Sequence, residues 1–234
     1  METTTLQTGK KIYFASDFHL GIPDYASSLV REKKIVRWLD TIKEDAQEIF
    51  LLGDIFDFWF EYKTVVPKGF IRFLGKITEL ADKGIIIHLF RGNHDIWAFD
   101  YFSEECNVHL HREPKVRNFN NTNFLLAHGD GLGPGDKHYK FMKSLFENKL
   151  LQWAFKWIHP DIGTRLGLYS SHQSRLSNIA KENKLDKELS LNQIPLYHYT
   201  KEHLVKNPDI NYYIYGHYHM IKQEKLNNSS EFIL

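Results

Sequence analysis

The sequence predicts an α/β fold, in which helices cover a β-sheet. Short apolar runs typical of buried strands alternate with longer segments of helical periodicity through the first 90 residues. Polar or glycine residues follow these runs closely, and loops at the ends of neighbouring strands meet at one edge of a sheet. With 234 residues, 42% of them hydrophobic, the chain can bury a sizeable core in one large domain or two small ones.

The first half of the chain is predicted to hold three strands and two helices. Residues 11–16 (KIYFAS), 48–52 (EIFLL) and 85–90 (IIIHLF) are the three strands. Apolar residues recur near helical spacing over residues 29–45 and 70–82. The order strand, helix, strand, helix, strand indicates a sheet that is covered by helices.

The pattern changes beyond residue 100. Alternation over residues 107–116 and a turn at 118–123 predict a hairpin that leads into a strand at 123–127 (NFLLA). Residues 137–206 lack strand alternation and are predicted to be mostly helical.

The C-terminal part is predicted to return to strands. Residues 211–215 (NYYIY) are the last clear strand, and residues 221–234 are expected to form a hairpin around Asn227 and Asn228. No internal repeat, low-complexity tract or linker divides the sequence, so we expect a single domain over residues 1–234.

Composition excludes several classes of protein. The single cysteine, Cys106, excludes an internal disulfide framework and a thiolate metal cluster, and the thirteen histidines make imidazole and carboxylate the expected ligands. A formal net charge of +1 gives no global attraction to nucleic acid. The polar residues 1–11 lack the apolar core of a signal peptide, and no stretch approaches the roughly 18 apolar residues of a membrane span. We therefore expect a cytoplasmic protein, with association with a membrane surface left open.

Side chains that bind divalent metals recur at the ends of the predicted strands. Taken singly, each such motif is more often a loop or a solvated turn, but five of them in this order indicate a dinuclear site. Carboxylate and imidazole are the ligands of metals that act on phosphate, and a bridging carboxylate holds two of them roughly 3.5–4 Å apart. Asp54 is the predicted bridge, because it follows a buried strand and a glycine. The five motifs are Asp17-Phe18-His19, Gly53-Asp54, Gly92-Asn93-His94-Asp95, His128-Gly129-Asp130 and Gly216-His217-Tyr218-His219.

These motifs resemble those of the calcineurin-like metallophosphoesterase superfamily, over about residues 11–220. The resemblance implies a four-layer αββα sandwich of two mixed sheets flanked by helices, with the metals at the strand ends. It implies that one metal is held by Asp17, His19, Asp54 and His219, and the other by Asp54, Asn93, His128 and His217.

The expected chemistry is attack of water on a phosphate ester. Two divalent cations make hydroxide available near neutral pH and stabilise charge that grows in the transition state. His94 is the predicted catalytic residue, which hydrogen-bonds the phosphate or protonates the leaving oxygen. Asp95 is expected either to orient a histidine or to stabilise a turn. The resemblance favours Mn²⁺, whereas the ligands alone also suit Zn²⁺ or Fe.

The helical segment carries the information on substrate. Residues 137–175 contain seven basic and two acidic residues, an excess of five positive charges, interleaved with aromatic and aliphatic side chains. This pattern suits a helix packed on the domain with solvated lysines, or an anionic lipid surface. Nucleic acid fits less well, because the aromatic residues cluster with aliphatic ones instead of standing apart for base stacking.

A long helical insertion at about residues 137–206 is similar to that of the UDP-2,3-diacylglucosamine pyrophosphatases of lipid A biosynthesis, in which it forms a lid over the metals. The resemblance implies a lipid-linked nucleotide sugar as substrate, with UMP and 2,3-diacylglucosamine 1-phosphate as products. It also implies a monomer or weak oligomer at the inner-membrane surface. The predicted substrate-binding residues are Asp136, Tyr139, Arg165, Ser171 and Arg175.

The sequence departs from that family at two points. The best-known members carry arginine where this chain has His94, so the lipid substrate is less firmly predicted than the metal chemistry. The chain also stops at Leu234, where relatives continue with another strand, so we expect a further C-terminal piece. A phosphodiesterase or phosphatase for another substrate is the first alternative. A non-catalytic scaffold is the second, although such scaffolds typically lose ligands that are all present here.

Overall fold

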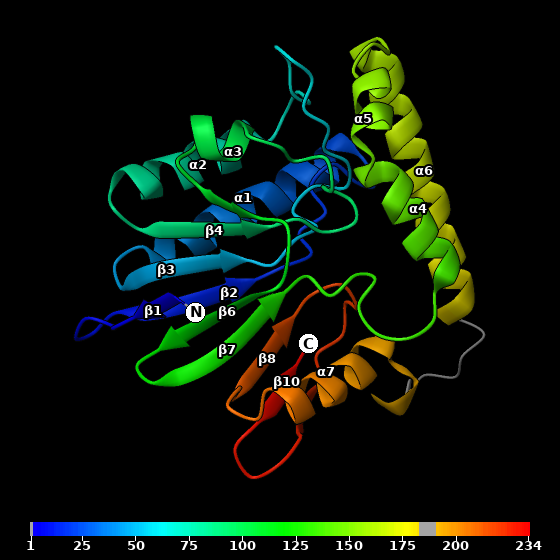
Figure 1. The fold of residues 1–234 in the computed structure, drawn as a ribbon. Helices are drawn as coiled ribbons and strands as arrows, with labels where there is room; N and C mark the ends of the chain where they lie inside the picture. The colour runs from blue at the N-terminus through cyan, green and yellow to red at the C-terminus, as the bar shows by residue number, and fades with distance from the viewer. Residues whose placement is uncertain (1, 183–190) are drawn as a thin grey trace.

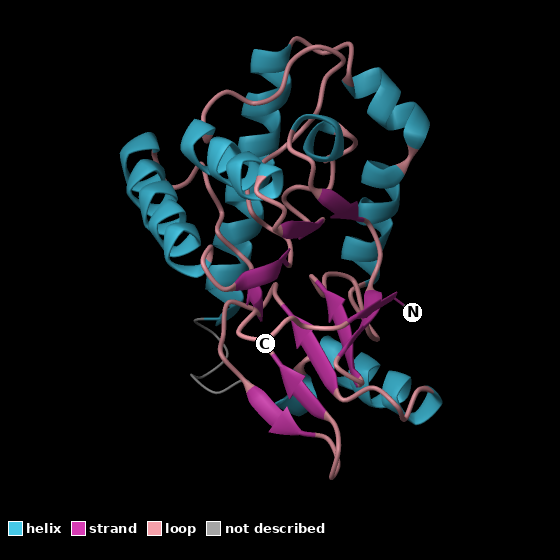
Figure 2. Ribbon diagram, turned by 90° about the vertical axis from the view of Figure 1, so that its left-hand side faces the viewer, coloured by secondary structure: helices cyan, strands magenta, loops and turns pink. Residues whose placement is uncertain are grey.

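Two β-sheets packed face to face form the centre of the fold, and helices cover their outer sides (Figures 1 and 2). The computed structural model describes residues 2–182 and 191–234, and it describes side chains for residues 2–173 and 191–234. Three hydrophobic clusters separate the layers: one between the two sheets and one on the outer face of each sheet. The order of layers is therefore helix, sheet, sheet, helix, as the resemblance implied.

The first sheet has four strands in the order β2-β3-β4-β5, and all of them pair in parallel. The resemblance implied two mixed sheets, so the described strands of this sheet depart from that expectation. The reason is the connections, because helices join β2 to β3, β3 to β4 and β4 to β5, and such crossovers leave neighbouring strands parallel. The strands are β2 Lys11–Ala15, β3 Ala46–Leu51, β4 Ile86–Phe90 and β5 His109–His111, and the helices are α1 Tyr25–Ile42, α2 Ile71–Asp82 and α3 Tyr101–Glu105.

Alternation along β3 shows how this sheet is buried on both faces. Ile49 and Leu51 belong to the cluster that packs against α1 and α2, whereas Phe50 lies in the cluster between the sheets. The predicted strands and helices of this half are thus confirmed, with boundaries that differ by a few residues.

The second sheet has six strands in the order β1-β6-β7-β8-β10-β9, and it is mixed. Helix α7 covers its outer face, where Leu196 and Tyr197 pack against Tyr213, Tyr215 and Phe232. The C-terminal hairpin is confirmed, since β9 and β10 pair antiparallel. The elements are β1 Glu2–Thr4, β6 Lys115–Phe119, β7 Thr122–Ala127, β8 Tyr212–Tyr215, β9 Gln223–Lys225, β10 Glu231–Ile233, the 3-10 helix η1 Leu191–Gln193 and α7 Pro195–Lys206.

The predicted strand arm over residues 107–116 is wrong in one respect, because the structure divides it between the two sheets. Its first part is β5, which pairs with β4 of the first sheet, and its last residues begin β6 of the second sheet. Pro114 lies between the two strands and has no N–H to continue a ladder. The hairpin itself is formed by β6 and β7, which a turn at Asn120 and Asn121 connects with positive φ at both residues.

Three helices are inserted in the chain between β7 and α7, and they stand at one side of the two sheets (Figure 1). They are α4 Lys137–Glu147, α5 Lys149–Phe155 and α6 Pro160–Glu182, in agreement with the predicted helical segment. None of the helices in the described residues is long and apolar enough to cross a membrane.

Candidate metal centre

The predicted metal ligands all follow strands, and both sheets contribute them. Asp17 follows β2, Asp54 follows β3 and Asn93 follows β4 in the first sheet, whereas His128 follows β7 and His217 follows β8 in the second. The strands within each of these two sets run in parallel, so their carboxyl ends lie at a common edge. The structure therefore brings the five motifs of the sequence together at one place.

The backbone at this edge is bent into a conformation that non-glycine residues rarely adopt. Five of the predicted ligands have positive φ: Asp17 (57°), His19 (43°), Asp54 (51°), His217 (77°) and His219 (49°). Each such residue costs of order 1–3 kcal/mol, and such strain concentrates at functional sites. These residues follow β2, β3 and β8, so the strained backbone lies where the polar side chains gather.

Two glycines permit the close approach of these loops. A Cβ atom on Gly92 would lie 2.1 Å from Oδ1 of Asp54, and one on Gly53 would lie 2.7 Å from Nδ1 of His128. Any side chain at these positions would displace the carboxylate or the imidazole. The glycines in the Gly-Asp and Gly-Asn motifs are therefore explained by packing around Asp54.

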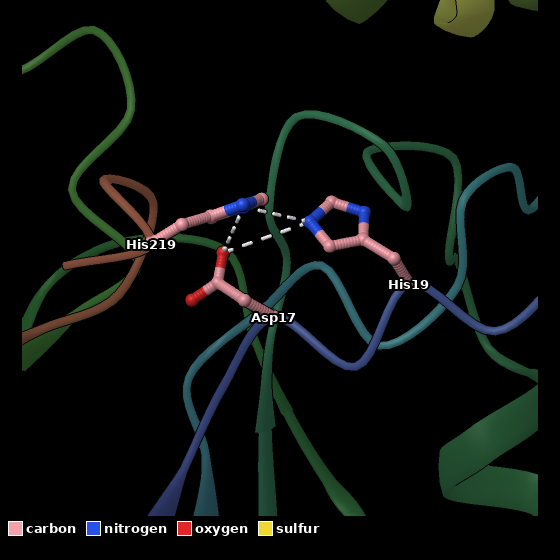
Figure 3. Close-up of side chains that lie close together, drawn as sticks. All are labelled: Asp17, His19 and His219. Atoms are coloured by element: carbon pink, nitrogen blue, oxygen red, sulfur yellow. Dashed lines mark hydrogen bonds and ion pairs between the residues drawn. The ribbon is translucent and has the colours of Figure 1, made fainter. Parts of the chain in front are cut away.

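The first group of ligands consists of Asp17, His19 and His219 (Figure 3). Nε2 of His19 lies 2.9 Å from Nε2 of His219, and Oδ1 of Asp17 lies 3.3 Å from Nε2 of His219 and 3.8 Å from Nε2 of His19. Figure 3 shows the three side chains pointing toward one another, Asp17 and His19 from the segment after β2 and His219 from the segment after β8. The side chain of His219 is 48% exposed, so this group opens to solvent.

The second group consists of Asp54, His128 and His217, whose ligand atoms lie within 4.8 Å of one another. Oδ2 of Asp54 lies 3.3 Å from Nε2 of His128, which is also 3.3 Å from Oδ1 of Asn93. The same Oδ2 atom lies 3.7 Å from Nε2 of His19 in the first group. Asp54 thus stands between the two groups, as a bridging ligand would.

The pKa values at the site show that its buried carboxylates favour positive charge nearby. Burial disfavours ionisation of Asp54, yet the neighbouring His128, His94 and His19 hold the pKa of its carboxyl far below the usual range. Burial likewise opposes protonation of His128, but the charge of Asp54 and its hydrogen bond raise the pKa of that imidazole to about 10. His217 differs, because burial and the nearby His128 lower its pKa to about 4.

Only histidines form ion pairs with Asp17 and Asp54 among the described side chains. Buried carboxylates that no lysine or arginine neutralises, surrounded by imidazoles, form a donor set that suits divalent cations. The residues present therefore fit two such ions.

Asp95 has a structural task in the turn after β4. Its carboxylate accepts hydrogen bonds from the backbone N–H groups of Gly92 (2.6 Å) and Ile55 (2.7 Å). Burial and the charge of Asp54 raise its pKa to about 6. Of the two predicted roles, the geometry therefore favours the turn over the orientation of a histidine.

Asp57 lies beside the histidines instead, and the sequence analysis assigned it no role. Its Oδ1 atom lies 3.5 Å from Nδ1 of His19 and 3.8 Å from Nδ1 of His94. It is the third residue after Asp54 in the same loop, and this spacing was the available signal. A carboxylate on the far nitrogen of a ligand histidine orients the ring and raises its basicity.

The predicted catalytic residue His94 is held at the same place. Its backbone N–H donates to Oδ1 of Asp54 (2.9 Å), and its Nδ1 atom lies 3.0 Å from the carbonyl oxygen of Asp57. The side chain lines a cavity of about 790 Å³ that also contains His19, Asp54 and His217 in its wall.

This cavity extends from the ligands to the α4–α6 helices. Of the predicted substrate-binding residues, Asp136, Tyr139 and Ser171 line it. Arg165 is exposed and is not among its lining residues, so the structure does not bring Arg165 to this site. Arg175 lies outside the residues whose side chains the structure describes.

Asp136 and Tyr139 also anchor helix α4. Asp136 caps the helix by accepting from the N–H of Tyr139 (3.2 Å), and the Tyr139 hydroxyl donates to Oδ2 of Asp130 (2.5 Å). Lys143 Nζ lies 2.8 Å from the same oxygen. Asp130, two residues after His128, therefore ties α4 to the edge where the ligands lie, a role that the sequence did not reveal.

The α4–α6 helices expose an unusual amount of apolar surface. Neither α4 nor α5, both described in full, contains a buried residue. Exposed apolar side chains that form a large patch mark an interaction surface more often than a solvated one. The large exposed apolar residues of these helices are Phe141, Leu150, Leu151, Trp153, Ile162, Leu166, Leu168 and Tyr169, with Trp157 between α5 and α6.

Comparison with known proteins identifies the family of this chain. Residues 10–220 match the family of calcineurin-like phosphoesterases. A UDP-2,3-diacylglucosamine hydrolase of Porphyromonas gingivalis is 36% identical over 96% of this chain and 88% of its own length. Proteins of the same name from Histophilus somni (26% identical, 90% and 84% covered) and Neisseria meningitidis serogroup A (28% identical, 74% and 70% covered) are also similar.

Proposed function

The chain belongs to the calcineurin-like phosphoesterase family, and from this premise we propose that it hydrolyses UDP-2,3-diacylglucosamine to UMP and 2,3-diacylglucosamine 1-phosphate. The observation that carries the proposal is the cavity, which connects the Asp and His cluster to the α4–α6 helices. A substrate with a pyrophosphate and two acyl chains needs both parts: a polar centre for the phosphates and an apolar wall for the chains.

The lining of the cavity supports such a substrate. One part of the wall is formed by the carboxylate and imidazole groups, and the other contains many apolar side chains. We propose that α4–α6, within an insertion at about residues 137–206, act as a lid that holds the acyl chains. The apolar residues of the wall are Phe58, Ile96, Trp97, Leu132, Met142, Phe146 and Met220.

We infer that two divalent cations, Mn²⁺ in our proposal, occupy the site. One would be held by Asp17, His19, Asp54 and His219, and the other by Asp54, Asn93, His128 and His217. When bound, such a pair supplies Lewis-acid stabilisation of the phosphate oxygens and activates water for attack on phosphorus.

We propose that His94 and its neighbours orient the phosphate and supply the proton for the leaving group. A carbonyl oxygen can only accept, so the contact between Nδ1 of His94 and the Asp57 carbonyl places a proton on Nδ1. The other ring nitrogen, Nε2, is then available to the cavity that His94 lines. We propose that Nε2 hydrogen-bonds the phosphate under attack or, in the protonated ring, donates a proton to the leaving oxygen. Asp57 and Asp95 hold the surrounding loops and rings in place.

The experiment that tests the substrate uses purified protein with Mn²⁺ and UDP-2,3-diacylglucosamine, and it measures release of UMP. A simple aryl phosphodiester serves as the second substrate, because it needs the metals but no acyl-binding surface. UMP release supports the proposal. Hydrolysis of the aryl diester without UMP would overturn the lipid substrate and leave a phosphodiesterase for a different, smaller ester. Failure on both, with two bound metals, would overturn the proposed enzyme activity.

We also propose that the protein works as a monomer or weak oligomer at the cytoplasmic face of the inner membrane, where its substrate would lie. The exposed apolar residues of α4–α6 are interleaved with lysines, the composition of a surface that binds anionic lipid. Trp153 and Trp157, with ring centroids 6.1 Å apart, are 58% and 76% exposed.

Replacing both tryptophans by alanine should weaken co-sedimentation with anionic vesicles. The control is Val205→Ala, which shortens an even more exposed apolar residue (83%) on α7, the helix that covers the second sheet. Unchanged co-sedimentation of the double tryptophan variant would contradict the membrane proposal. The proposed hydrolysis of UDP-2,3-diacylglucosamine would still stand, because UMP release tests it separately.

A further inference from the structure

Helix α6 contacts the loop that follows Asp54 along a stripe of small residues one helical turn apart. A Cβ atom on Gly163 would lie 2.1 Å from the hydroxyl of Tyr62, and one on Gly167 would lie 2.0 Å from the ring of Phe58. Ser171, one turn further, is only 8% exposed. The backbone of α6 therefore packs directly against residues 57–62, and Ser171 lies at the end of this contact.

Ser171 reaches the catalytic centre from the end of this contact. Its hydroxyl donates to Oδ2 of Asp57 (2.7 Å), and its Oγ atom lies 3.0 Å from Nδ1 of His94. Because the hydroxyl proton is directed to the carboxylate, the lone pairs of Oγ remain to accept the N–H of His94. The hydrogen bonds therefore run in one direction, from His94 to Ser171 to Asp57.

This arrangement determines which nitrogen of His94 is protonated. Nδ1 faces two acceptors, Oγ of Ser171 and the carbonyl oxygen of Asp57, so the neutral ring carries its proton on Nδ1. Rotation of the ring by half a turn would replace Nδ1 by a carbon and lose both hydrogen bonds. The Nε2 atom is thereby kept toward the cavity in a single tautomer.

We propose that Ser171 is a positioning residue, through which α6 holds the His94 ring in the orientation and tautomer that the reaction needs. The inference rests on the proposed phosphoesterase activity but not on the lipid substrate. It differs from the sequence prediction, in which Ser171 contacts the substrate. It also makes the packing of α6 on residues 57–62 a condition for catalysis, because the hydroxyl comes from the helix and both of its partners come from the loops that follow β3 and β4.

The first test compares Ser171→Ala with the unaltered enzyme on the aryl phosphodiester and on UDP-2,3-diacylglucosamine. Loss of a group that orients a catalytic or ligand histidine typically costs about 10–100-fold. We expect kcat to fall by that factor on both substrates, with KM changed little. A rise of KM on the lipid substrate alone, with the aryl diester unaffected, would overturn the positioning role and restore a substrate contact.

A double-mutant cycle with His94→Ala makes the test specific. If Ser171 acts through His94, Ser171→Ala should have less than about a twofold further effect once the ring is gone, since effects at contacting residues are not additive. An equal loss in both backgrounds would overturn the proposal. Ser171→Thr keeps a hydroxyl and should recover part of kcat.

Nuclear magnetic resonance of ¹⁵N-histidine-labelled, metal-free protein gives a readout that does not depend on turnover. The His94 ring should show the Nδ1–H tautomer in the unaltered protein. In Ser171→Ala only one of the two acceptors, the Asp57 carbonyl, still favours that tautomer, so a measurable fraction of the Nε2–H tautomer should appear. A single unchanged tautomer in the variant would contradict the inference.

Two matched substitutions separate this role from a general loss of structure. Gly167→Ala should reproduce the His94 defect although Ser171 is intact, because its Cβ would meet Phe58 and lift the helix. Gly75→Ala in α2 adds the same methyl group where nothing lies within 4 Å and should leave kcat unchanged. Ser144→Ala on α4, whose exposed hydroxyl donates only to the Phe141 carbonyl in its own helix, is the matched serine control. Normal kcat in Gly167→Ala would overturn the link between the packing of α6 and His94.

Discussion

Two clusters of histidine and carboxylate are buried in this molecule, and they differ in what neutralises them. One is the metal centre at the strand ends. The other, which we call the inter-sheet cluster, consists of Glu48, His88, His111, Arg117 and Thr4. Glu48 and His88 are on the first sheet and Arg117 is on the second, so this cluster joins the two sheets.

The inter-sheet cluster contains its own cation. Nη2 of Arg117 donates to both oxygens of Glu48 (2.9 and 3.1 Å) and to Oγ1 of Thr4 (2.8 Å). His88 lies 2.9 Å from Glu48 and 2.8 Å from His111. Burial, together with nearby positive charge, lowers the pKa of His88 and lowers that of His111 to about 3.

The metal centre shows the opposite response. The pKa of His128 is raised to about 10, whereas the pKa of His88 is lowered, although both are buried imidazoles beside a carboxylate. Burial lowers the pKa of both imidazoles, but at His128 the charge and hydrogen bond of Asp54 outweigh it. At His88 burial outweighs the hydrogen bond with Glu48, and the nearby Arg117 lowers the pKa further. The backbones differ too: the titratable members of the inter-sheet cluster lie within regular strands, but five ligands of the metal centre have positive φ. A buried carboxylate that is already paired stabilises the fold, and one left without a permanent cation is available to a metal.

The largest expected effect is that of Asp54→Asn on catalysis. Loss of the bridging carboxylate should lower kcat/KM on the aryl phosphodiester by about 10³-fold, since the metals supply several kcal/mol and each 1.36 kcal/mol is a factor of ten. Bound metal, measured by elemental analysis, should fall below two ions per chain. Asp82→Asn, an exposed carboxylate at the end of α2, is the control and should change neither quantity. Full activity of Asp54→Asn would contradict the assignment of Asp54 to a metal centre that catalysis needs.

Arg117→Met should act on stability and leave catalysis alone. The substitution leaves the buried carboxylate of Glu48 without its cation. Breaking a buried ion pair in this way typically lowers the free energy of unfolding by about 3–5 kcal/mol. Urea denaturation measures this, with kcat per folded molecule expected to stay unchanged.

Two further variants sharpen that prediction. Glu48→Leu combined with Arg117→Met replaces both charges and should cost less than Arg117→Met alone. Glu2→Gln removes an exposed partner of Arg117 and should cost no more than about 1 kcal/mol. An Arg117→Met variant that is stable but inactive would contradict the assignment of the inter-sheet cluster to stability and of the metal centre to catalysis.

Metal removal should lower stability by an amount that the inter-sheet cluster does not influence. Each of the two ions, at 100 times its dissociation constant, stabilises the folded chain by about 2.7 kcal/mol. For a chain of this size that corresponds to a Tm about 5–11 °C higher for each ion, because 1 kcal/mol is worth about 2–4 °C. Differential scanning calorimetry with and without a chelator measures the shift, which should be the same in Arg117→Met. No shift on chelation would contradict a metal-bound native state.

The smallest effect concerns pH. Because the folded pKa of His111 lies below that of the unfolded chain, the unfolded state binds more protons as the pH falls below about 6.5. The free energy of unfolding contributed by this group is therefore present above about pH 6.5 and is lost as the pH falls toward about 3. His111→Gln should flatten the dependence of urea stability on pH between 6.5 and 4.5. An unchanged slope would show that His111 is not held neutral in the folded protein.

Local patterns in the sequence were enough for most elements. Strands β2, β3, β4 and β8 and the C-terminal hairpin follow from apolar runs and turn residues, which depend on nearby residues only. The division of residues 107–116 between two sheets did not follow, because alternation indicates a strand but says nothing about its partner. Pro114 was a signal for a break and was not used.

The same limit applied to the site. The five motifs predicted that the candidate ligands would lie together, because each motif follows a strand and the ends of parallel strands converge. The contact of Ser171 with His94 joins residues 77 apart in the chain, and the packing of α6 on residues 57–62 depends on the shapes of two distant segments. Arg165 shows the converse, since its charge and position suited substrate but its side chain is exposed away from the cavity lining.

By itself, the sequence determined the order of elements and the donor atoms at the strand ends, because periodicity and motif spacing are local properties of the chain. The tertiary structure alone decided which buried carboxylate is paired with Arg117 and which is left to a metal. It also decided that Asp57 and Ser171 both contact His94, the proposed catalytic residue. The physical reason is that charge compensation and hydrogen bonding depend on distances between segments, and only the packed sheets and helices set those distances.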